Sequence, residues 1–117
     1  RIARTFFNTG DLIKSCDIGL STVVLEKKII NKHIAFPNLR TKEDFVLWLK
    51  ILEKRYVIGS IKTKLSRWRK LDNSLSSNVL QKLIDGYKVY FVYMNFNFFK
   101  SIYYLLLLSL NYIRKLN

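Results

Sequence analysis

Several residue types are scarce in this sequence, and each shortage excludes a kind of site. Cys16 is the only cysteine, so the chain cannot form an internal disulfide. His33 is the only histidine, which leaves little material for a histidine-rich metal site or a serine–histidine–aspartate triad. No Asp-x-Asp motif and no glycine-rich phosphate loop occur among the 117 residues. The sequence therefore predicts no metal site and no nucleotide-binding loop of its own.

The single thiol is better suited to packing than to chemistry. Cys16 is followed by Asp17 and Ile18, and no histidine or other base lies near it in the sequence. A free cysteine without such a partner usually behaves as a small apolar residue. The lack of disulfides also fits a reducing compartment, so we expect a cytoplasmic protein.

Acidic side chains are scarce as well. Eight aspartates and glutamates stand against 21 lysines and arginines, which gives a formal net charge of +13. Seven basic residues and no acid fall between residues 54 and 70, and only basic charges occur from Lys88 onward. This excess favours an anionic partner, such as the phosphates of a nucleotide-sugar, a lipid-linked acceptor, an anionic membrane or nucleic acid. Lysines that only fill solvated faces are the plainer alternative.

Apolar residues, by contrast, are abundant. Half of the residues are hydrophobic and 15% are aromatic, a composition that excludes intrinsic disorder. A chain of 117 residues can bury one modest core. We therefore expect part of the apolar surface to face a missing half of the protein, a lipid surface or a second copy in a homo-oligomer.

An acidic pair, Glu43-Asp44, opens the most apolar helix that the sequence predicts. This helix is expected over residues 41–56, with Thr41 as its cap and Trp48 one turn after Asp44. The helix dipole stabilises acids in the first turn, which accounts for the pair by capping alone. A carboxylate held on a rigid helix at the edge of a core can also take a proton from a sugar hydroxyl. Both interpretations are open at this point.

The remaining secondary structure is predicted to mix short strands with helices. β-Branched or alternating segments predict strands, and apolar periodicity with polar caps predicts helices. The expected strands cover 21–25, 56–61 and 65–71. A short helix is expected from residue 9 and a helical turn at 26–31. Two long helices are expected over 75–94 and 98–115, with a break at 95–97. We divide the chain into residues 1–74 and a C-terminal helical pair over residues 75–117.

The last of these helices allows two interpretations. Its apolar stretch falls short of the ~20 residues that a membrane span needs. It can pack against the preceding helix. It can also lie in the plane of an anionic membrane, where its aromatic residues and the basic Lys100, Arg114 and Lys115 suit the headgroup boundary. The second interpretation places the protein at the inner face of the cell membrane.

Several groups of residues occur in one order at a characteristic spacing. They are CDIGLSTVV at 16–24, FPN at 36–38, EDFVLWL at 43–49, WR at 68–69 and NSLS at 73–76. Together they resemble the C-terminal, acceptor-side half of a bacterial family 2 glycosyltransferase. The resemblance implies an α/β fold of the GT-A type, of which this chain is a mainly helical portion with a few short strands.

The resemblance also implies roles for particular residues. In that family a Glu-Asp pair carries the catalytic base, which implies Asp44 as the base and Glu43 beside it in the site. A later segment closes over the donor phosphates, which implies that Arg69, with Arg67, binds them. Leu71 stands where the family often has a histidine. No phosphate or metal contact is therefore expected at that position.

The predicted reaction moves a sugar from a nucleotide-sugar to a hydroxyl of a glycan or lipid-linked acceptor, with inversion at the anomeric carbon. Ser21, Thr22 and Trp48 are expected to contact the acceptor. A divalent metal, Mg²⁺ or Mn²⁺, is expected in the complete enzyme, with ligands on a nucleotide-binding half that this sequence lacks. The sequence opens at Arg1, and we expect it to be a piece of a longer protein that is inactive by itself.

A non-catalytic alternative also fits the composition. A basic helical module that binds nucleic acid or an anionic membrane would explain the net charge of +13, and Trp68 is available to stack on bases. Most aromatic residues, however, fall in apolar helices and not among the arginines and lysines. Nucleic acid is therefore the less favoured partner.

Overall fold

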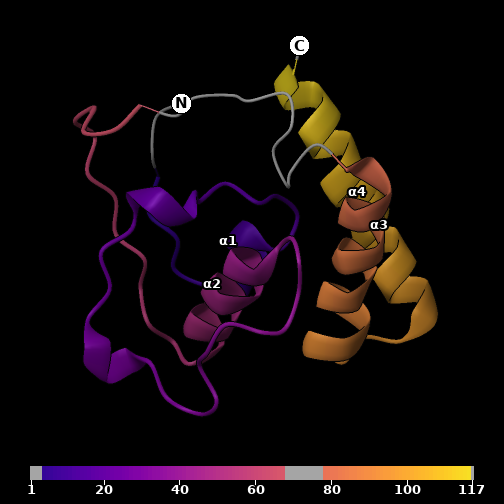
Figure 1. The fold of residues 1–117 in the computed structure, drawn as a ribbon, viewed down its shortest axis with the longest axis horizontal. Helices are drawn as coiled ribbons and strands as arrows, with labels where there is room; N and C mark the ends of the chain where they lie inside the picture. Colours follow the sequence, from indigo (N-terminus) through magenta and orange to yellow (C-terminus); the bar gives the residue numbers. More distant parts are fainter. Residues whose placement is uncertain (1–3, 68–77, 117) are drawn as a thin grey trace.

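The buried helix that was predicted to carry the acidic pair is present. The computed structural model describes residues 4–67 and 78–116, and in it α2 runs over Glu43–Glu53. Residues 45–49 are all buried, and Ile51 and Leu52 complete the apolar surface. As predicted, α2 is therefore enclosed on most sides, and the N-terminal part of the chain wraps around it (Figure 1).

α2 ends earlier than predicted because Arg55 turns left-handed, with a φ of 63°. The N–H of Arg55 donates to the carbonyl of Leu52, and the N–H of Tyr56 donates to the carbonyl of Ile51. These two bonds form the Schellman arrangement that closes the last turn of a helix. The helix that was predicted to reach Tyr56 thus stops at Glu53.

The start of α2 also differs from the prediction. Lys42 occupies the N-cap position in a left-handed conformation (φ 68°), and its side chain makes no capping hydrogen bond. Thr41, the predicted cap, donates both its backbone N–H and its hydroxyl to Asp85 Oδ2, each over 2.9 Å. The predicted Thr41 cap is wrong because a carboxylate 44 positions later in the chain takes both donors.

The predicted strands form no sheet within residues 4–67 and 78–116. Residues 20–22 form a 3-10 turn, η1 (Leu20–Thr22), and Val24 is fully exposed without a pairing partner. In the segment 56–61 only Ile58 pairs, through an isolated antiparallel bridge to Phe6 with both N···O distances at 3.0 Å.

Of the predicted strand over 65–71, residues 65–67 carry no strand and the others lie outside the described ranges. β-Propensity mainly reports how well a side chain packs on neighbouring strands, and no strand of the described ranges lies beside these segments. The described part is mainly helical, as predicted, but the strands predicted at 21–25 and 56–61 are wrong, and residues 65–67 carry none.

Short helical segments occur where polar residues predicted them. α1 (Thr9–Leu12) has a complete capping box, in which Asn8 and Asp11 each accept the backbone N–H of the other. η2 (Lys27–Ile29) is a 3-10 turn within the turn expected at 26–31. α1 buries Leu12 in the same apolar cluster as α2. The N-terminal segment is thereby fixed beside the acidic pair's helix.

The next described element is α3 (Val79–Lys88), which continues directly into a π-helical turn, η4 (Val89–Tyr93). Asn78 caps α3 by accepting the N–H of Gln81 over 3.0 Å. The predicted helix start at 75 and the proposed boundary between 74 and 75 lie outside the described residues. That division of the chain stays a prediction.

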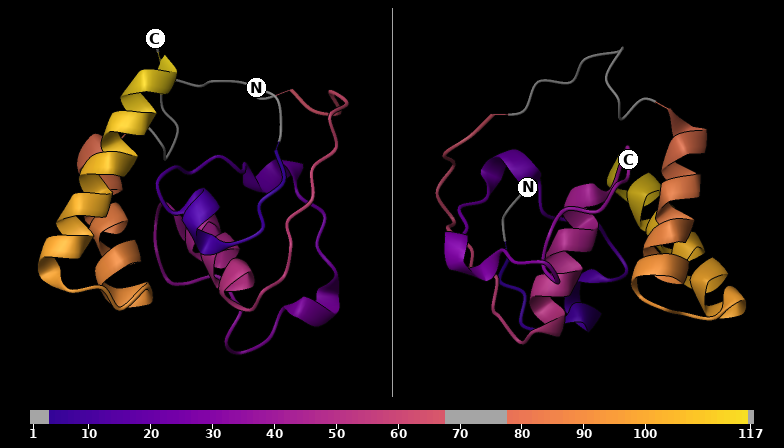
Figure 2. Two further views of the ribbon diagram at one scale, coloured as in Figure 1. Left: turned by 180° about the vertical axis from the view of Figure 1, so that it is seen from behind. Right: turned by 60° about the horizontal axis from the view of Figure 1, so that its bottom comes forward.

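The break predicted at 95–97 is confirmed. Asn95 turns left-handed with a φ of 53°, and Asn97 accepts the N–H of Lys100 over 2.9 Å at the start of α4 (Phe98–Leu116). α3 and α4 lie side by side as a hairpin against the N-terminal part (Figures 1 and 2). No helix in the described ranges has the length and apolarity that crossing a membrane requires.

Tyr90 joins this hairpin to the N-terminal part of the chain. Its phenol is fully buried and donates a 2.8 Å hydrogen bond to the carbonyl of Ile13. Its ring lies edge-on to Phe45 at a centroid distance of 6.4 Å and stacks on Tyr104 at 5.6 Å. One apolar cluster therefore includes residues of α1, α2, η4 and α4.

Candidate active site

Glu43 and Asp44 form the first turn of α2, directly after the left-handed Lys42. Both acidic side chains are half-buried. Asp44 Oδ1 accepts the N–H of Phe45 over 2.8 Å, which holds the carboxylate against the start of the helix. Because residues 45–49 behind it are buried, the carboxylate is mounted on an element with little freedom to move.

The electrostatic setting of Asp44 distinguishes it from an ordinary capping residue. Burial raises the pKa of Asp44 above its usual value, because the charged form loses contact with water. Glu43 adds to this increase, whereas the hydrogen bond from Phe45 and the charge of Lys42 oppose it. A carboxylate that only caps a helix has a lowered pKa, because backbone N–H groups favour its charged form. A raised pKa is what a general base needs.

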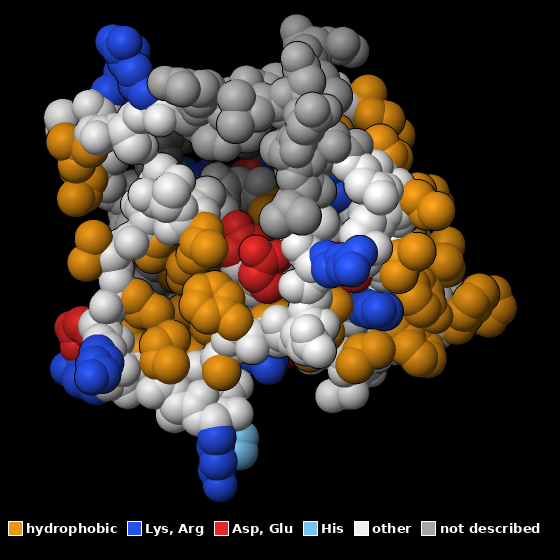
Figure 3. Space-filling view, viewed as in Figure 1, with side chains coloured by type: hydrophobic (Ala, Val, Ile, Leu, Met, Phe, Trp, Pro, Cys, Tyr) orange, Lys and Arg blue, Asp and Glu red, His pale blue; other side chains and the backbone are white. Residues whose placement is uncertain are grey.

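Some acidic side chains lie together on the surface. Figure 3 shows them near the middle of one face, with apolar side chains on one side and basic side chains on the other, while another acidic side chain lies apart at the edge of this face.

Within the described residues, no hydrogen bond or ion pair links Ser21, Thr22 or Arg67 to the acidic pair. Ser21 and Thr22 are exposed in η1, where the Thr22 hydroxyl donates to the carbonyl of Gly19 over 2.7 Å. Arg67 is exposed, and Arg69 lies outside the described residues. Their roles in acceptor and donor binding stay predictions.

Trp48 lies one turn after Asp44, but it is only 2% exposed. Its indole Nε1 has no hydrogen-bond partner among the described residues. A buried N–H without an acceptor loses hydration and gains nothing in return. Because Trp48 is buried, its ring packs in the core. Its contact with the acceptor stays a prediction.

Cys16 also lies within electrostatic reach of Asp44. Burial raises the pKa of its thiol to about 11; Lys42 opposes the increase, and Asp44 and Asp17 add to it. The thiol is therefore protonated at neutral pH, and a protonated thiol is a poor nucleophile. This result agrees with the expectation that Cys16 packs and does not react.

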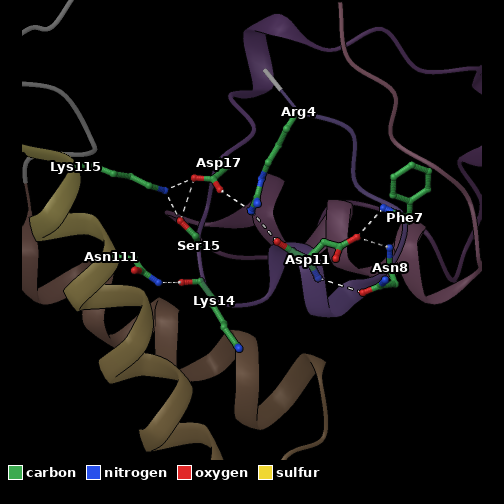
Figure 4. Close-up of polar contacts among 9 residues, drawn as sticks. All are labelled: Arg4, Phe7, Asn8, Asp11, Lys14, Ser15, Asp17, Asn111 and Lys115. Atoms are coloured by element: carbon green, nitrogen blue, oxygen red, sulfur yellow. Dashed lines mark hydrogen bonds and ion pairs between the residues drawn. The ribbon is translucent and has the colours of Figure 1, made fainter. Parts of the chain in front are cut away.

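Asp17 fixes the last turns of α4 beside this region (Figure 4). Its carboxylate accepts a 3.2 Å bond from Arg4 and a 3.0 Å bond from the Ser15 hydroxyl, and it forms an ion pair with Lys115. Asn111 adds a 2.9 Å bond to a backbone carbonyl of the same segment. Burial alone would raise the pKa of Asp17, but the bonds from Lys115 and Ser15 lower it below its usual value. The segment at 14–17 thus serves here as an anchor for the hairpin.

Asp85 is the residue near the site that sequence reasoning missed. It lies on α3, is 1% exposed, and accepts both donors of Thr41, two positions before Glu43. The available signal was its isolation, since it is the only acidic residue after Asp72. A lone carboxylate in an amphipathic helix predicts a specific buried partner, but the sequence does not show which one.

The described residues contain no group of three or more histidine, cysteine, aspartate or glutamate side chains placed to hold a metal ion. The divalent metal expected in the complete enzyme therefore has no fitting set of ligands in this part of the chain.

Curated proteins that resemble this chain are bacterial glycosyltransferases. TuaG of Bacillus subtilis (strain 168), named as a teichuronic acid biosynthesis glycosyltransferase, is 34% identical over 83 residues. WfaP and WfgD of Escherichia coli are both named UDP-Glc:alpha-D-GlcNAc-diphosphoundecaprenol beta-1,3-glucosyltransferase, and they are 36% identical over 77 residues and 38% identical over 97 residues.

These matches cover 71%, 66% and 81% of this chain but only 31%, 30% and 37% of the relatives, so the chain spans about a third of their length. No protein-family model and no solved structure matches the chain.

Proposed function

We propose that this chain, which is related to bacterial glycosyltransferases, supplies the acceptor side of an inverting transferase in which Asp44 is the catalytic base. The observation that carries the proposal is the setting of Asp44. Its carboxylate is half-buried at the first turn of a rigid helix, and its pKa is raised by burial. Assignment to family 2 and to the GT-A fold rests on the order of the motifs and belongs to the same proposal.

In the proposed reaction, the acceptor hydroxyl attacks the anomeric carbon of the nucleotide-sugar while Asp44 takes the hydroxyl proton. A bond forms between the acceptor oxygen and the anomeric carbon. The bond from that carbon to the diphosphate breaks, and the nucleoside diphosphate leaves with the electron pair. Attack from the side opposite the leaving group inverts the anomeric centre. Base assistance of this kind contributes roughly a hundred- to ten-thousand-fold in rate.

Three other side chains have supporting roles in this proposal. Glu43 shapes the acceptor pocket, and Arg67 and Arg69 neutralise the charge that develops on the departing diphosphate. No step is assigned to a metal on this chain, since its described residues offer no ligand set. Binding of Mg²⁺ or Mn²⁺ and of the nucleotide belongs to other parts of the complete protein.

For substrates we propose a UDP-sugar and a lipid-linked acceptor. The names of two relatives specify UDP-glucose and a GlcNAc-diphosphoundecaprenol acceptor. The polyprenyl chain of such an acceptor lies in the bilayer and presents its sugar at the surface. An enzyme that uses it must therefore work at the membrane boundary.

The proposed activity is tested with the complete protein that contains this chain. Purified enzyme is incubated with radiolabelled UDP-glucose, GlcNAc-diphosphoundecaprenol and Mg²⁺ or Mn²⁺, and the label in the lipid extract is measured. We expect a labelled lipid with a β-linked sugar, because inversion converts the α-linked donor to a β-linked product. An α-linked product would exclude inversion. No labelled lipid with UDP-glucose, UDP-galactose or UDP-N-acetylglucosamine would reject the proposed function.

α4 presents a surface that suits the membrane boundary. Its exposed side carries apolar residues at helical spacing, with exposed fractions from 52% to 81%. We call them the outer stripe: Phe99, Tyr103, Leu106, Leu110 and Ile113. On the opposite side of the helix, Ser101 and Leu108 are buried in the protein. α4 therefore packs in the core with one face and leaves a second apolar face in water.

The charges of the hairpin favour an anionic lipid surface as the occupant of the outer stripe. The solvent-accessible charged residues of residues 78–115 are all basic, and they include Lys88, Lys100 and Arg114. The only carboxylate in that range, Asp85, is buried. Each basic residue near an anionic membrane contributes about 1 kcal/mol of binding, which salt screens. We therefore propose that the outer stripe lies on the cytoplasmic leaflet.

A triple substitution tests this surface. Replacing Phe99, Leu106 and Leu110 by serine is expected to lower co-sedimentation with phosphatidylglycerol vesicles more than roughly tenfold, because each apolar side chain contributes about 1.5–3 kcal/mol when it leaves water. Val24→Ser is the matched control, since Val24 is fully exposed on a different segment. Unchanged vesicle binding by the triple variant would contradict the proposal. Loss of a dimer in sedimentation velocity, with vesicle binding intact, would assign the stripe to a second copy of the chain.

A further inference from the structure

We infer that Asp85 is a positioning residue for the catalytic pair: its buried carboxylate on α3 fixes Thr41 and thereby the first turn of α2. The inference rests on the proposed function of Asp44. Asp85 is 1% exposed, and its Oδ2 accepts the Thr41 N–H and the Thr41 hydroxyl, both at 2.9 Å. Thr41 is separated from Glu43 by a single residue, so a restraint on Thr41 acts directly on the acidic pair.

The restraint explains the unusual backbone at the helix start. A threonine at this place would normally cap the helix with its hydroxyl. Here Asp85 takes that hydroxyl, and Lys42 becomes the N-cap residue with a φ of 68°, a region that is strained for residues with a Cβ. Such strain persists only where the surrounding structure imposes it. The two hydrogen bonds to Asp85 restrain Thr41, the residue before Lys42.

Asp85 is itself firmly mounted. Burial alone would raise the pKa of Asp85, but hydrogen bonds from Gln81 and Thr41 lower it below its usual value, so the group is charged at neutral pH. The next residue, Gly86, faces Leu105 and Leu108 of α4. A Cβ built on Gly86 would come within 2.9 Å of Leu105 Cδ1. α3 therefore lies tightly against α4, and the carboxylate has a fixed position from which to hold Thr41.

A shift of the first turn would matter for the reaction. Asp44 must lie within hydrogen-bond reach of the acceptor hydroxyl, and a misplacement of about 1 Å can lower the rate on the order of a hundred-fold. Without Asp85, the Thr41 hydroxyl is free to return to the capping position and Lys42 can relax. Glu43 and Asp44 would then move together, although both remain chemically intact and no hydrogen bond between described residues joins either of them to Asp85.

The test compares Asp85→Ala with Asp85→Asn in the complete protein, using the transferase assay. Asp85→Ala removes both acceptors, and we expect kcat to fall on the order of a hundred-fold with the donor KM unchanged. The acid limb of the kcat profile should also move to lower pH, because Asp44 becomes better hydrated. Asp85→Asn retains an acceptor oxygen and should restore most of kcat. Glu53→Gln, at the exposed far end of α2, is the control and should change neither quantity.

A purely structural role predicts a different result. If Asp85 only stabilised the fold, Asp85→Ala would lower the melting temperature but leave kcat per folded molecule and the pH profile unchanged. That result would overturn the inference. If Asp85→Ala fails to fold, Thr41→Val provides the second variant, since it removes only the hydroxyl bond and should give a smaller fall in kcat with the same shift in pH profile. An unchanged kcat in Thr41→Val would then count against the inference.

Hydrogen exchange separates failure of this inference from failure of the proposed function. The amides of Thr41, Phe45 and Val46 are bonded to Asp85, Asp44 and the Lys42 carbonyl, respectively. We expect all three to exchange faster in Asp85→Ala, and those of Phe45 and Val46 to do so in Thr41→Val, whether or not the protein is a transferase. Unchanged exchange at Phe45 and Val46 would mean that Asp85 does not set the first turn, even if Asp44 is the base.

Discussion

Replacing Asp44 by asparagine is expected to lower sugar transfer by the complete protein roughly a hundred- to ten-thousand-fold, which is the contribution of a general base. Asparagine has nearly the same shape and can still accept the N–H of Phe45, but it cannot take a proton from the acceptor. The assay is the formation of labelled glycolipid under single-turnover conditions. Glu43→Gln is the matched control, and it should cost much less because Glu43 only shapes the pocket. If Asp44→Asn turned over within a few-fold of wild type, Asp44 would only cap the helix and would not be the base.

Although Asp44→Asn is expected to lower activity, we expect it to leave the free energy of unfolding unchanged or to increase it. The folded-state pKa of Asp44 is raised above its ordinary value of 3.8, so ionisation of this group is less favourable in the folded state. Its stabilising contribution is therefore present below the unfolded pKa and is lost as pH rises through the folded pKa. Asp44→Asn avoids that loss, and we expect it to melt at the same or a higher temperature than wild type at pH 7. The difference should vanish in acid, where Asp44 is protonated.

Replacing Tyr90 by alanine is expected to have the largest effect on stability, about 3–5 kcal/mol, because it removes a fully buried ring from the centre of the core. The ring contacts residues of both halves, so its loss should loosen the hairpin from α2. Tyr90→Phe keeps the ring and removes only the bond to the Ile13 carbonyl, which should cost about 1 kcal/mol. Urea unfolding, followed by circular dichroism of the helices, gives both values.

The control for this series is Tyr103, whose ring is 57% exposed on α4. Tyr103→Ala should change the free energy of unfolding by less than about 0.5 kcal/mol, as surface substitutions usually do. If Tyr90→Ala also changed the free energy of unfolding by less than about 0.5 kcal/mol, the hairpin would not pack against α1 and α2 as described.

Local patterns predicted those features that local interactions determine. The apolar run at 45–52 predicts a buried helix, and α2 is one. The asparagines at 95 and 97 predict a break between helices, because one tolerates a left-handed turn and the other caps the next helix. The resemblance to bacterial glycosyltransferases is confirmed by sequence similarity to three of them.

Features that depend on distant contacts were mispredicted. The segment 21–25 is rich in β-branched residues, yet no strand lies beside it in the described ranges. Its first residues belong to the 3-10 turn η1 instead. Thr41 looks like a cap in sequence, but its donors are bound by Asp85 from a helix that follows much later. In the candidate site, the acidic pair and the rigid helix were predictable from the local pattern. The burial that raises the pKa of Asp44 was not, since it depends on how the rest of the chain packs around it.

The bond between Thr41 and Asp85 also has a consequence for the order of events during synthesis. The two residues are 44 positions apart, so α2 leaves the ribosome well before its partner on α3 does. An early chain can form α2 and its Schellman end from nearby residues, but the left-handed turn at Lys42 lacks the restraint from Asp85 until the hairpin docks. The geometry of the acidic pair is thus completed late, once the C-terminal helices have folded, and a truncated or stalled chain carries the acids without their final setting.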